Sequence, residues 1–445
     1  MKHAVIILFR SLAACLVLTA LAAHSALAQN AIGPVSITGD TGDTFRELLS
    51  DTRIQQSLEQ ILEREPETIA EQIRLTEIPA PPFMEEERAE DYLRQMRNRG
   101  LGNARIDGEG NVIGRWQGSG DGPLFVLSAH LDTVFPMDTD VTVQERDGRY
   151  HAPGISDDGR GLAVLLTVIE TLTQSGIETV GDILFVGTVG EEGRGDLRGV
   201  KALFNDHPDI DAFVSIDSSG LSSITHGATG SRRFEVQFSG PGGHSFGAFG
   251  MASAIHAMGR AITKIGDLEV PEEPRTTFTV GTVEGGTSVN SIAGDAVFAL
   301  DMRSNSPDEL IALEERVWQA VREAVEEENS RWEQPEQITV EFELIGDRPA
   351  GLTAADHPLV QSTALAFDAV DSGVEALRRS STDSNVPMSL GIPAVTIGGG
   401  GRASGAHSLS EWFEPVDSHQ GPQAAWLLML AMVGVEGLTH PLLKD

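Results

Sequence analysis

Cysteine and lysine are scarce in this 445-residue chain. Cys15 is the only cysteine, and the four lysines stand at positions 2, 201, 264 and 444. A single cysteine cannot form an internal disulfide, so packing or bound metal must stabilise the fold. The formal net charge is −34, and a field of that sign repels phosphate, which excludes nucleic acid and anionic membrane surfaces as partners. We interpret the acidity as a solubility adaptation; steering of cationic substrates is the alternative.

The N-terminal segment has no apolar run long enough to span a membrane. Its uninterrupted apolar stretch runs from Leu12 to Ala23, which is shorter than the roughly 20 residues that a spanning helix needs. Lys2 and Arg10 precede this stretch, and "ALA" stands before Gln29. This pattern predicts a signal peptide over residues 1–28, cleaved after Ala28, and export to the periplasm or the medium. Lipidation at Cys15, which ends the motif "LAAC", is the alternative.

Length and apolar pattern predict two domains with an α/β fold. Apolar strands such as "FVLSAH", "DILFVGTVG" and "DAFVSID" alternate with helices, which favours a mostly parallel, buried sheet. From about residue 230 the strands alternate polar and apolar residues, which is typical of an antiparallel sheet with helices on one face. The first pattern returns near residue 351. We therefore predict one domain built from residues 29–229 and 347–445, with an inserted α+β domain at 230–346. Residues 45–75 are predicted to be helical.

Histidines and acidic residues follow the predicted strands at the points where those strands end. They are His130, Asp132, Asp157, Asp158, Glu191, Glu192, Asp217 and His407. The carboxyl ends of parallel strands share one edge of a sheet, so these side chains are expected to converge on a single crevice.

Imidazole and carboxylate groups without thiolate are a ligand set typical of hydrolytic zinc sites. His130 and Asp132 are two residues apart, so Asp132 can accept the spare imidazole N–H of His130. The "DD" turn at 157 and 158 can present one carboxylate to two metal ions. Glu191 and Glu192 point to opposite sides of an extended chain. If one binds metal, the other faces water and substrate, where it can act as a general base.

Seven motifs occur in an order that resembles a known enzyme family. They are "SAHLDTV", "GISDDGRG", "GEEG", "SID", "GPGGHS", "GGTSVNSIAGDAVFALDMRS" and "GAHSLSEW". This order resembles the co-catalytic zinc exopeptidase and amidohydrolase family that includes peptidase T, glutamate carboxypeptidase, succinyl-diaminopimelate desuccinylase and aminoacylase. The resemblance covers nearly all of the chain after about residue 60 and implies that the inserted domain is a lid and a dimer interface.

The resemblance also implies a role for each residue of the site. His130 and Asp217 would hold one zinc ion, Glu192 and His407 the other, with Asp157 bridging both through a turn often held by a cis peptide bond to Asp158. Glu191 would be the general base, Asp132 the partner of His130, and His244 a group that stabilises the oxyanion, in dimeric members from the other subunit. Asn290 and Arg303 would bind a substrate carboxylate, and Asp383, in "SSTDSN", would help to position substrate.

The function that these residues predict is hydrolysis of small peptides by an exopeptidase of aminopeptidase or tripeptidase type with two Zn²⁺, for which Co²⁺ or Mn²⁺ could substitute. A deacylase of N-acyl amino acids or a carboxypeptidase on the same metal core is the alternative. Two remote alternatives are a serine hydrolase, because "GHSFG" contains Ser245 in a G-x-S-x-G motif, and a non-catalytic binding protein. Replacing Ser245 would disable only the serine hydrolase, and replacing Glu191 would leave a binding protein unaffected.

Overall fold

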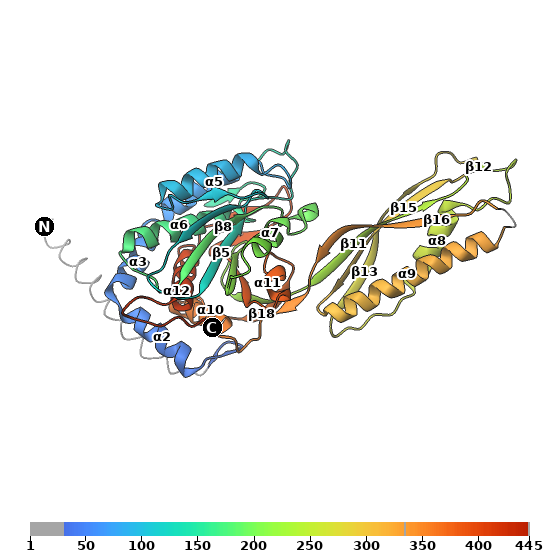
Figure 1. Cartoon of the computed structure of the whole chain (residues 1–445). Helices are drawn as coiled ribbons and strands as arrows, with labels where there is room; N and C mark the ends of the chain where they lie inside the picture. The colour runs from blue at the N-terminus through green and yellow to red at the C-terminus, as the bar shows by residue number, and fades with distance from the viewer. Residues whose placement is uncertain (1–30, 333–334, 444–445) are drawn as a thin grey trace.

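The computed structural model describes residues 31–332 and 335–443, which form a main domain and an inserted domain (Figure 1). The main domain comprises the described residues before Gly230 and after Arg348, and the inserted domain lies between them. The predicted signal peptide and Cys15 lie outside the described residues. Among the helices described, none combines the length and apolar character that crossing a membrane requires.

A twisted sheet forms the centre of the main domain. In spatial order its strands are β17 (Gly351–Leu352), β10 (Ser223–Ala228), β19 (Ala394–Ile397), β9 (Ala212–Ile216), β5 (Leu124–His130), β8 (Asp182–Thr188), β4 (Val112–Trp116) and β3 (Arg105–Ile106), with β18 (Ala376–Ser380) paired to β10. The middle strands β19, β9, β5 and β8 are parallel, whereas β4 and β10 join them antiparallel. The α/β fold is confirmed, and the sheet is mixed because its outer strands reverse direction.

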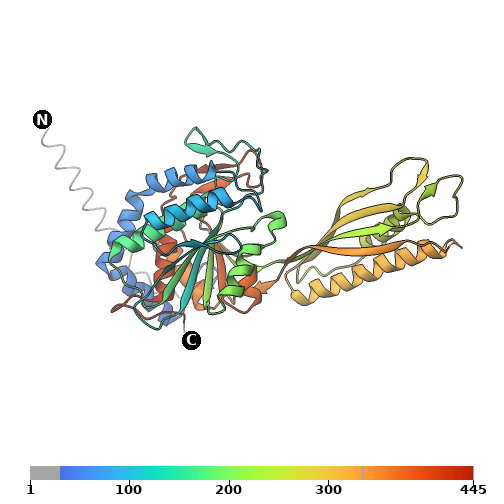
Figure 2. The same cartoon turned by 45° about the horizontal axis from the view of Figure 1, so that its top comes forward.

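Helices cover both faces of this sheet (Figures 1 and 2). They are α2 (Gly39–Ser50), α3 (Thr52–Glu63), α4 (Glu65–Thr76), α5 (Glu86–Asn98), α6 (Gly159–Ser175), α7 (Arg198–Asp206), α10 (Pro358–Ala369), α11 (Asn385–Ser389) and α12 (Gln420–Val433). The larger core packs α6, α10 and α12 against one face, and a second core packs α7 and α11 against the other. Helix α12 is apolar around its whole circumference because neighbouring elements enclose it on all sides.

The predicted helix over residues 45–75 is three helices in the structure. Asp51 has an extended backbone and its side chain accepts a hydrogen bond from the N–H of Arg53 at 2.8 Å, so it ends α2 and caps α3. Pro66 lies in the first turn of α4, where a residue without an N–H is tolerated. The prediction that residues 45–75 are helical is therefore confirmed, with two short breaks between the helices.

The inserted domain is an antiparallel sheet with two helices on one face. Its strands, in spatial order, are β13 (Thr276–Gly285), β15 (Asp295–Ser304), β11 (Gly230–Ser239) and β16 (Thr339–Arg348). Helices α8 (Ala254–Gly266) and α9 (Pro307–Ser330) share a core with this sheet. The short strands β12 (Gly243–His244) and β14 (Ser291–Ile292) pair with each other. Figure 1 places β12 at the end of the inserted domain that lies farthest from the main domain.

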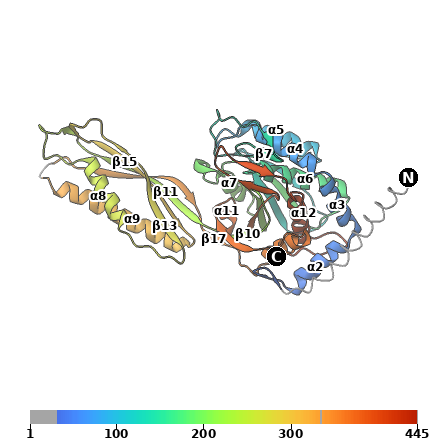
Figure 3. The same cartoon turned by 180° about the vertical axis from the view of Figure 1, so that it is seen from behind.

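The two domains meet where the chain enters β11 and leaves β16. Seen from behind, β17 lies on the side of the main domain that faces the inserted domain (Figure 3). A small sheet of the main domain, β20 (Arg402–Ser404), β21 (Trp412–Glu414), β7 (Arg149–His151) and β6 (Gln144–Arg146), lies beside the central one. The loop between β20 and β21 carries His407, so this small sheet is what positions that histidine.

Candidate active site

Acidic residues and a histidine gather at the carboxyl end of the parallel strands. His130 is the last residue of β5, and Asp217 follows directly after β9. Glu191 and Glu192 come shortly after the end of β8. Because β5 pairs in parallel with both β8 and β9, these residues lie at one edge of the sheet.

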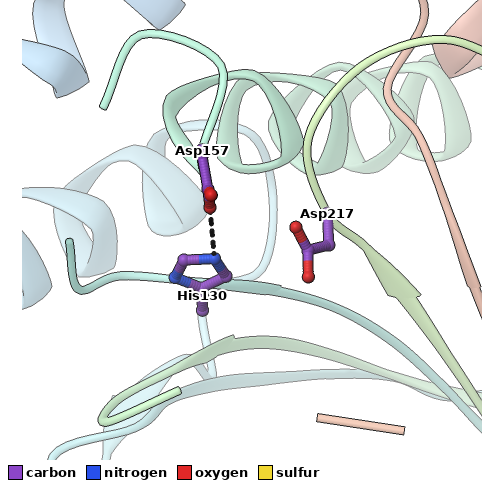
Figure 4. A group of neighbouring side chains, drawn as sticks. All are labelled: His130, Asp157 and Asp217. Atoms are coloured by element: carbon purple, nitrogen blue, oxygen red, sulfur yellow. Dashed lines mark hydrogen bonds and ion pairs between the residues drawn. The ribbon is translucent and has the colours of Figure 1, made fainter. Parts of the chain in front are cut away.

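His130, Asp157 and Asp217 form the first group of neighbouring side chains (Figure 4). The Nε2 atom of His130 lies 3.0 Å from Oδ1 of Asp157. One carboxylate oxygen of Asp217 lies within 4.8 Å of the ligand atoms of the other two. The three residues come from β5, the turn before α6 and the end of β9, and together they could hold a metal ion.

Asp157, Glu192 and His407 form a second group. The Nε2 atom of His407 lies 3.1 Å from Oδ2 of Asp157 and 2.8 Å from Oε1 of Glu192. Asp157 therefore belongs to both groups, with one carboxylate oxygen toward His130 and the other toward His407. A carboxylate in this position can bridge two metal ions. A third set of close ligand atoms joins His130 with Glu191 and Glu192.

Buried carboxylates hold the backbone of these residues in place. Asp158, which is joined to Asp157 by a cis peptide bond, accepts the N–H of His130 at 3.0 Å and caps α6 through the N–H of Gly161 at 2.9 Å. Glu411 accepts the N–H of Asp157 at 3.1 Å. Glu411 belongs to the "HSLSEW" segment, but the sequence analysis did not single it out, because nothing local shows that it reaches a turn more than 250 residues away.

Asp132 has partners besides the predicted His130. Its carboxylate accepts the backbone N–H groups of Glu191 at 3.0 Å and Glu192 at 2.8 Å. The Nδ1 atom of His130 lies 3.0 Å from the backbone oxygen of Asp132 and 3.7 Å from its carboxylate. The imidazole of His130 therefore lies against Asp132, as predicted, with the backbone oxygen nearer than the carboxylate. Asp132 thus links β5 to the pair of glutamates.

Burial and charge shift the pKa values of the site strongly. Hydrogen bonds that the His407 imidazole donates to the carboxylates of Asp157 and Glu192 raise the pKa of His407 to about 10. Burial, together with the charge of Asp157, raises the pKa of Asp217 to about 7. Burial also raises the pKa of Glu191 well above its ordinary value, although Arg348 opposes it. The site thus concentrates acidic groups in a buried environment, and such a concentration of acidic groups favours the binding of cations.

A cavity of about 410 Å³ opens beside the two groups. Its lining includes site residues of the main domain, the segment Ser380, Ser381 and Thr382, and three arginines of the inserted domain, Arg233, Arg303 and Arg348. Arg348 lies 3.3 Å from Oε1 of Glu191 and donates to the backbone oxygen of the same residue. Arg303 lies in a recognisable motif, whereas Arg233 on β11 and Arg348 on β16 lie in no motif and were not predicted from the sequence.

The match to a known family decides the class of this site. Residues 126–431 match the sequence model described as Peptidase family M20/M25/M40, which is more than half of the chain. The chain belongs to this family. It is therefore a metal-dependent peptidase or hydrolase, and the two groups around Asp157 are the candidate metal centre of an M20-family enzyme.

Individual proteins of known name resemble this M20-family chain along most of its length. The succinyl-diaminopimelate desuccinylase of Corynebacterium glutamicum is 25% identical over 351 residues, which cover 76% of this chain and 89% of that protein. The aminopeptidase PepT of Bacillus cereus has the same fold, with a TM-score of 0.66 and 22% identity over 81% of this chain and 96% of that one. The YXEP protein of Bacillus subtilis, described as a dinuclear metal-binding peptidase of the M20 family, has a TM-score of 0.62 and 16% identity over 83% and 98%.

Two of the residues singled out by their motifs lie away from the metal centre of this M20-family chain. His244 is exposed on β12, and its Nδ1 atom accepts the N–H of Phe246 at 3.2 Å. Asn290 is exposed just before β14 and accepts the hydroxyl of Ser288. Neither lines the cavity, so the structure of one chain does not bring them to the site.

Arg303 and Asp383 are placed close to the site instead. Arg303 lines the cavity. Asp383 is buried next to the lining segment 380–382, and its Oδ2 atom accepts the hydroxyl of Thr188, the last residue of β8, at 2.6 Å. Burial raises the pKa of Asp383 to about 6. Asp383 thus holds the end of β8 just before the two glutamates.

Ser245 does not have the surroundings of a nucleophile elbow. The elbow places its serine in a sharp turn from a buried strand directly into a helix. Ser245 follows the two-residue strand β12 and lies in a turn, and α8 begins only at Ala254. The geometry therefore argues against the serine hydrolase.

Proposed function

We propose that this chain is a dinuclear zinc exopeptidase that hydrolyses amide bonds of small peptides, of aminopeptidase or tripeptidase type. His130 and Asp217 would hold one ion, and Glu192 and His407 would hold the other. The observation that carries the proposal is the Asp157 carboxylate, whose two oxygens lie 3.0 Å from His130 and 3.1 Å from His407. A shared carboxylate between a histidine at the end of β5 and a histidine in the loop between β20 and β21 is suited to a two-metal site.

The residues present fit zinc by their chemistry. Each group offers imidazole and carboxylate atoms, and both are borderline or hard ligands that zinc accepts in hydrolytic sites. Buried carboxylates fix the backbone of these ligands. Asp158 accepts the backbone N–H of His130, and Glu411 accepts the backbone N–H of Asp157. The same donors would also accept Co²⁺ or Mn²⁺, so activity with either metal is compatible with the proposal.

Glu191 acts as the general base in this proposal. Zinc in such a site lowers the pKa of water and polarises the carbonyl of the scissile amide. Glu191 accepts the proton of the attacking water at its carboxylate and delivers it to the nitrogen of the leaving amine. Arg348 holds Oε1 of Glu191 at 3.3 Å, so Oε2 is left for the proton. Asp132 fixes the backbone of Glu191, which keeps the carboxylate in place.

The second copy of the chain completes the site in this proposal. His244 is exposed on β12 at the far end of the inserted domain (Figure 1), and it does not line the cavity of its own chain. This position supports a homodimer through the inserted domain, in which His244 of each chain stabilises the oxyanion in the site of the other.

Export after cleavage behind Ala28 is part of the same proposal, and an N-terminus at Gln29 in protein recovered outside the cytoplasm would test it.

Deacylation of N-acyl amino acids is the second candidate. It uses the same metal core and the same base, and the similarity to a succinyl-diaminopimelate desuccinylase favours it. The arginines that line the cavity are suited to a substrate with carboxylates, which either reaction can involve.

The test is metal content together with a substrate panel. The purified mature protein is analysed for bound metals and then assayed on dipeptides, tripeptides and N-acyl amino acids before and after chelation. We expect two zinc ions per chain and cleavage of peptides that chelation abolishes and zinc restores. Cleavage of N-acyl amino acids alone would favour the second candidate. Activity that persists without metal would contradict both.

A further inference from the structure

Three arginines of the inserted domain face the acidic metal centre across the cavity. They are Arg233 on β11, Arg303 on β15 and Arg348 on β16. The chain has 66 acidic residues against 32 lysines and arginines. Three arginines on one side of a cavity are therefore unusual in a chain whose overall charge is strongly negative. The resemblance assigns binding of a substrate carboxylate to Asn290 and Arg303, and it gives Arg233 no role.

The strand register places these arginines on one face of the sheet. Ser231 of β11 pairs with Arg303 on one side and with Arg348 on the other, and Arg233 pairs with Asp301. Residues two apart on a strand share a face, and neighbouring strands lie about 4.8 Å apart. The three side chains therefore start within roughly 10 Å of one another at the end of the sheet that meets the main domain.

Arg232, the neighbour of Arg233, projects to the opposite face. It forms an ion pair with Glu314 of α9, on the helix-covered side of the sheet. Arg232 and Arg233 are thus the same residue type at adjacent positions with opposite surroundings. This difference supplies a matched control for any role of Arg233 in the cavity.

Arg233 and Arg303 share a single carboxylate. The Nε atom of Arg233 lies 3.0 Å from Oδ1 of Asp301, and Nε of Arg303 lies 2.8 Å from Oδ2. Two guanidinium groups with one counter-ion carry a net positive charge. Arg348 differs, because Glu191 already neutralises it.

Both of these guanidinium groups keep donors for a ligand. Among the described residues, the two Nη atoms of Arg303 and Nη2 of Arg233 have no hydrogen-bond partner, while Nη1 of Arg233 donates to the backbone oxygen of Gly193. The side chain of Arg303 is 42% exposed and that of Arg233 is 23% exposed. Asp301 therefore anchors both groups by their inner nitrogens and leaves outer nitrogens toward the cavity.

We propose that Arg233 and Arg303 together bind the two carboxylates of an acidic residue next to the scissile bond. The substrates would be dipeptides or N-acyl amino acids that end in Asp or Glu, because only there does the residue after the scissile bond carry two free carboxylates. Guanidinium groups recognise carboxylates by charge and by paired hydrogen bonds, and two of them are matched to a dicarboxylate. This inference rests on the proposed function and names the substrate class for the same site.

The first experiment compares two nearly isosteric dipeptides, Ala-Glu and Ala-Gln, with the metal-loaded full chain. We expect the wild type to prefer Ala-Glu by on the order of tenfold or more in kcat/KM. Arg233→Met should lower kcat/KM for Ala-Glu by about 10- to 100-fold, mainly through KM, and change Ala-Gln little. Arg233→Lys should recover part of the loss. Arg232→Met should leave the ratio of the two substrates unchanged.

Two outcomes of this comparison would overturn the inference. One is equal cleavage of Ala-Glu and Ala-Gln by the wild type. The other is an equal loss on both dipeptides in Arg233→Met, which would mean that Arg233 only supports Asp301 or the loop at Gly193.

The second experiment measures binding without turnover. Calorimetry compares L-glutamate with L-glutamine on the metal-loaded wild type and on Arg233→Met. We expect glutamate to bind the wild type on the order of tenfold more tightly than glutamine, and the variant to lose this difference. If no peptide is cleaved, the proposed function fails, and this measurement alone decides the inference. Equal binding of the two amino acids to the wild type would overturn it.

Discussion

At the scale of single residues, the adjacent glutamates of "GEEG" have separate partners. Glu192 lies 2.8 Å from His407, and Glu191 pairs with Arg348 at 3.3 Å. The carboxylate of Asp132 accepts the backbone N–H of both glutamates, so one carboxylate fixes the backbone from which both side chains project. Two like charges can stand side by side here because each faces a different cation or metal group.

Replacing the two glutamates should therefore have different effects. Glu191→Gln is expected to lower kcat by about 10²- to 10⁴-fold, because the general base is lost, and to leave both metal ions bound. Glu192→Gln should lose one metal ion per chain, because it removes a ligand charge. Metal analysis beside steady-state kinetics on both variants checks this. Loss of metal in Glu191→Gln would show that Glu191 is a metal ligand. The geometry would allow this, because ligand atoms of His130, Glu191 and Glu192 lie within 4.8 Å of one another.

The pH dependence should report the contact between Glu191 and Arg348. Burial raises the pKa of Glu191, and the charge of Arg348 acts in the opposite direction. A base works when deprotonated, so activity falls as the pH drops through its pKa. Arg348→Met removes the opposing charge and should move the acid limb of kcat/KM to higher pH, whereas Arg348→Lys should move it less. A uniform loss of rate at every pH, with the limb unmoved, would contradict this role.

At the scale of elements, the first turn of α6 supports both sides of the metal centre. A methyl group on Gly161 would lie 2.3 Å from Oδ1 of Asp158 and 2.3 Å from the backbone oxygen of Ile216. Asp158 holds the amide of His130, and Ile216 precedes Asp217 at the end of β9. The close approach of α6 to β9 thus sets the distance between ligands of the first group.

Gly161→Ala is therefore expected to destabilise the protein by about 1–3 kcal/mol through overpacking and to weaken metal binding. The matched control is Gly259→Ala in α8, where a methyl group would meet nothing within 4 Å. Because alanine favours the helix, the control should be neutral or stabilised by up to about 1 kcal/mol. Denaturant unfolding with and without chelator measures both changes. A Gly161→Ala variant with wild-type stability and metal content would contradict the role assigned to this contact.

At the scale of the whole molecule, the inserted domain touches the loop that carries the two glutamates. The carboxylate of Asp196 accepts the N–H of Asp347 at 2.9 Å, and Arg194 pairs with Glu235 at 2.9 Å. Arg348 contacts Glu191 itself. A movement of the inserted domain would therefore be transmitted directly to Glu191, the proposed general base.

The proposed dimer can be tested by mixing inactive variants. His244→Ala and Glu191→Ala should each have little activity alone. In a mixed dimer, the site with intact Glu191 receives His244 from the other chain, so subunit exchange should restore about a quarter of the wild-type activity. Ser245→Ala should remain fully active throughout. No recovery after exchange, with mixed dimers demonstrated by mass, would contradict the contribution of His244 from a second chain.

The sequence by itself determined the fold class and the set of residues that form the candidate metal centre. Apolar strands that end in His130, Asp217 and the glutamate pair predict convergence, because parallel strands share one edge. The half-exposed strands after residue 230 likewise predict an antiparallel inserted sheet, because burial on one face forces alternation. These inferences use periods of two or 3.6 residues, which local sequence records.

Only the tertiary structure decided which distant groups meet. Arg348 and Glu191 are 157 residues apart, and Asp157 and Glu411 are 254 apart, so no local pattern links them. The carboxylate of Asp132 serves the glutamate amides because β5 and β8 are neighbours in space. Arg233 lies near Arg303 and Arg348 because of the register of β11 against β15 and β16. Pairing between strands and packing between domains set these contacts, and both depend on the whole chain.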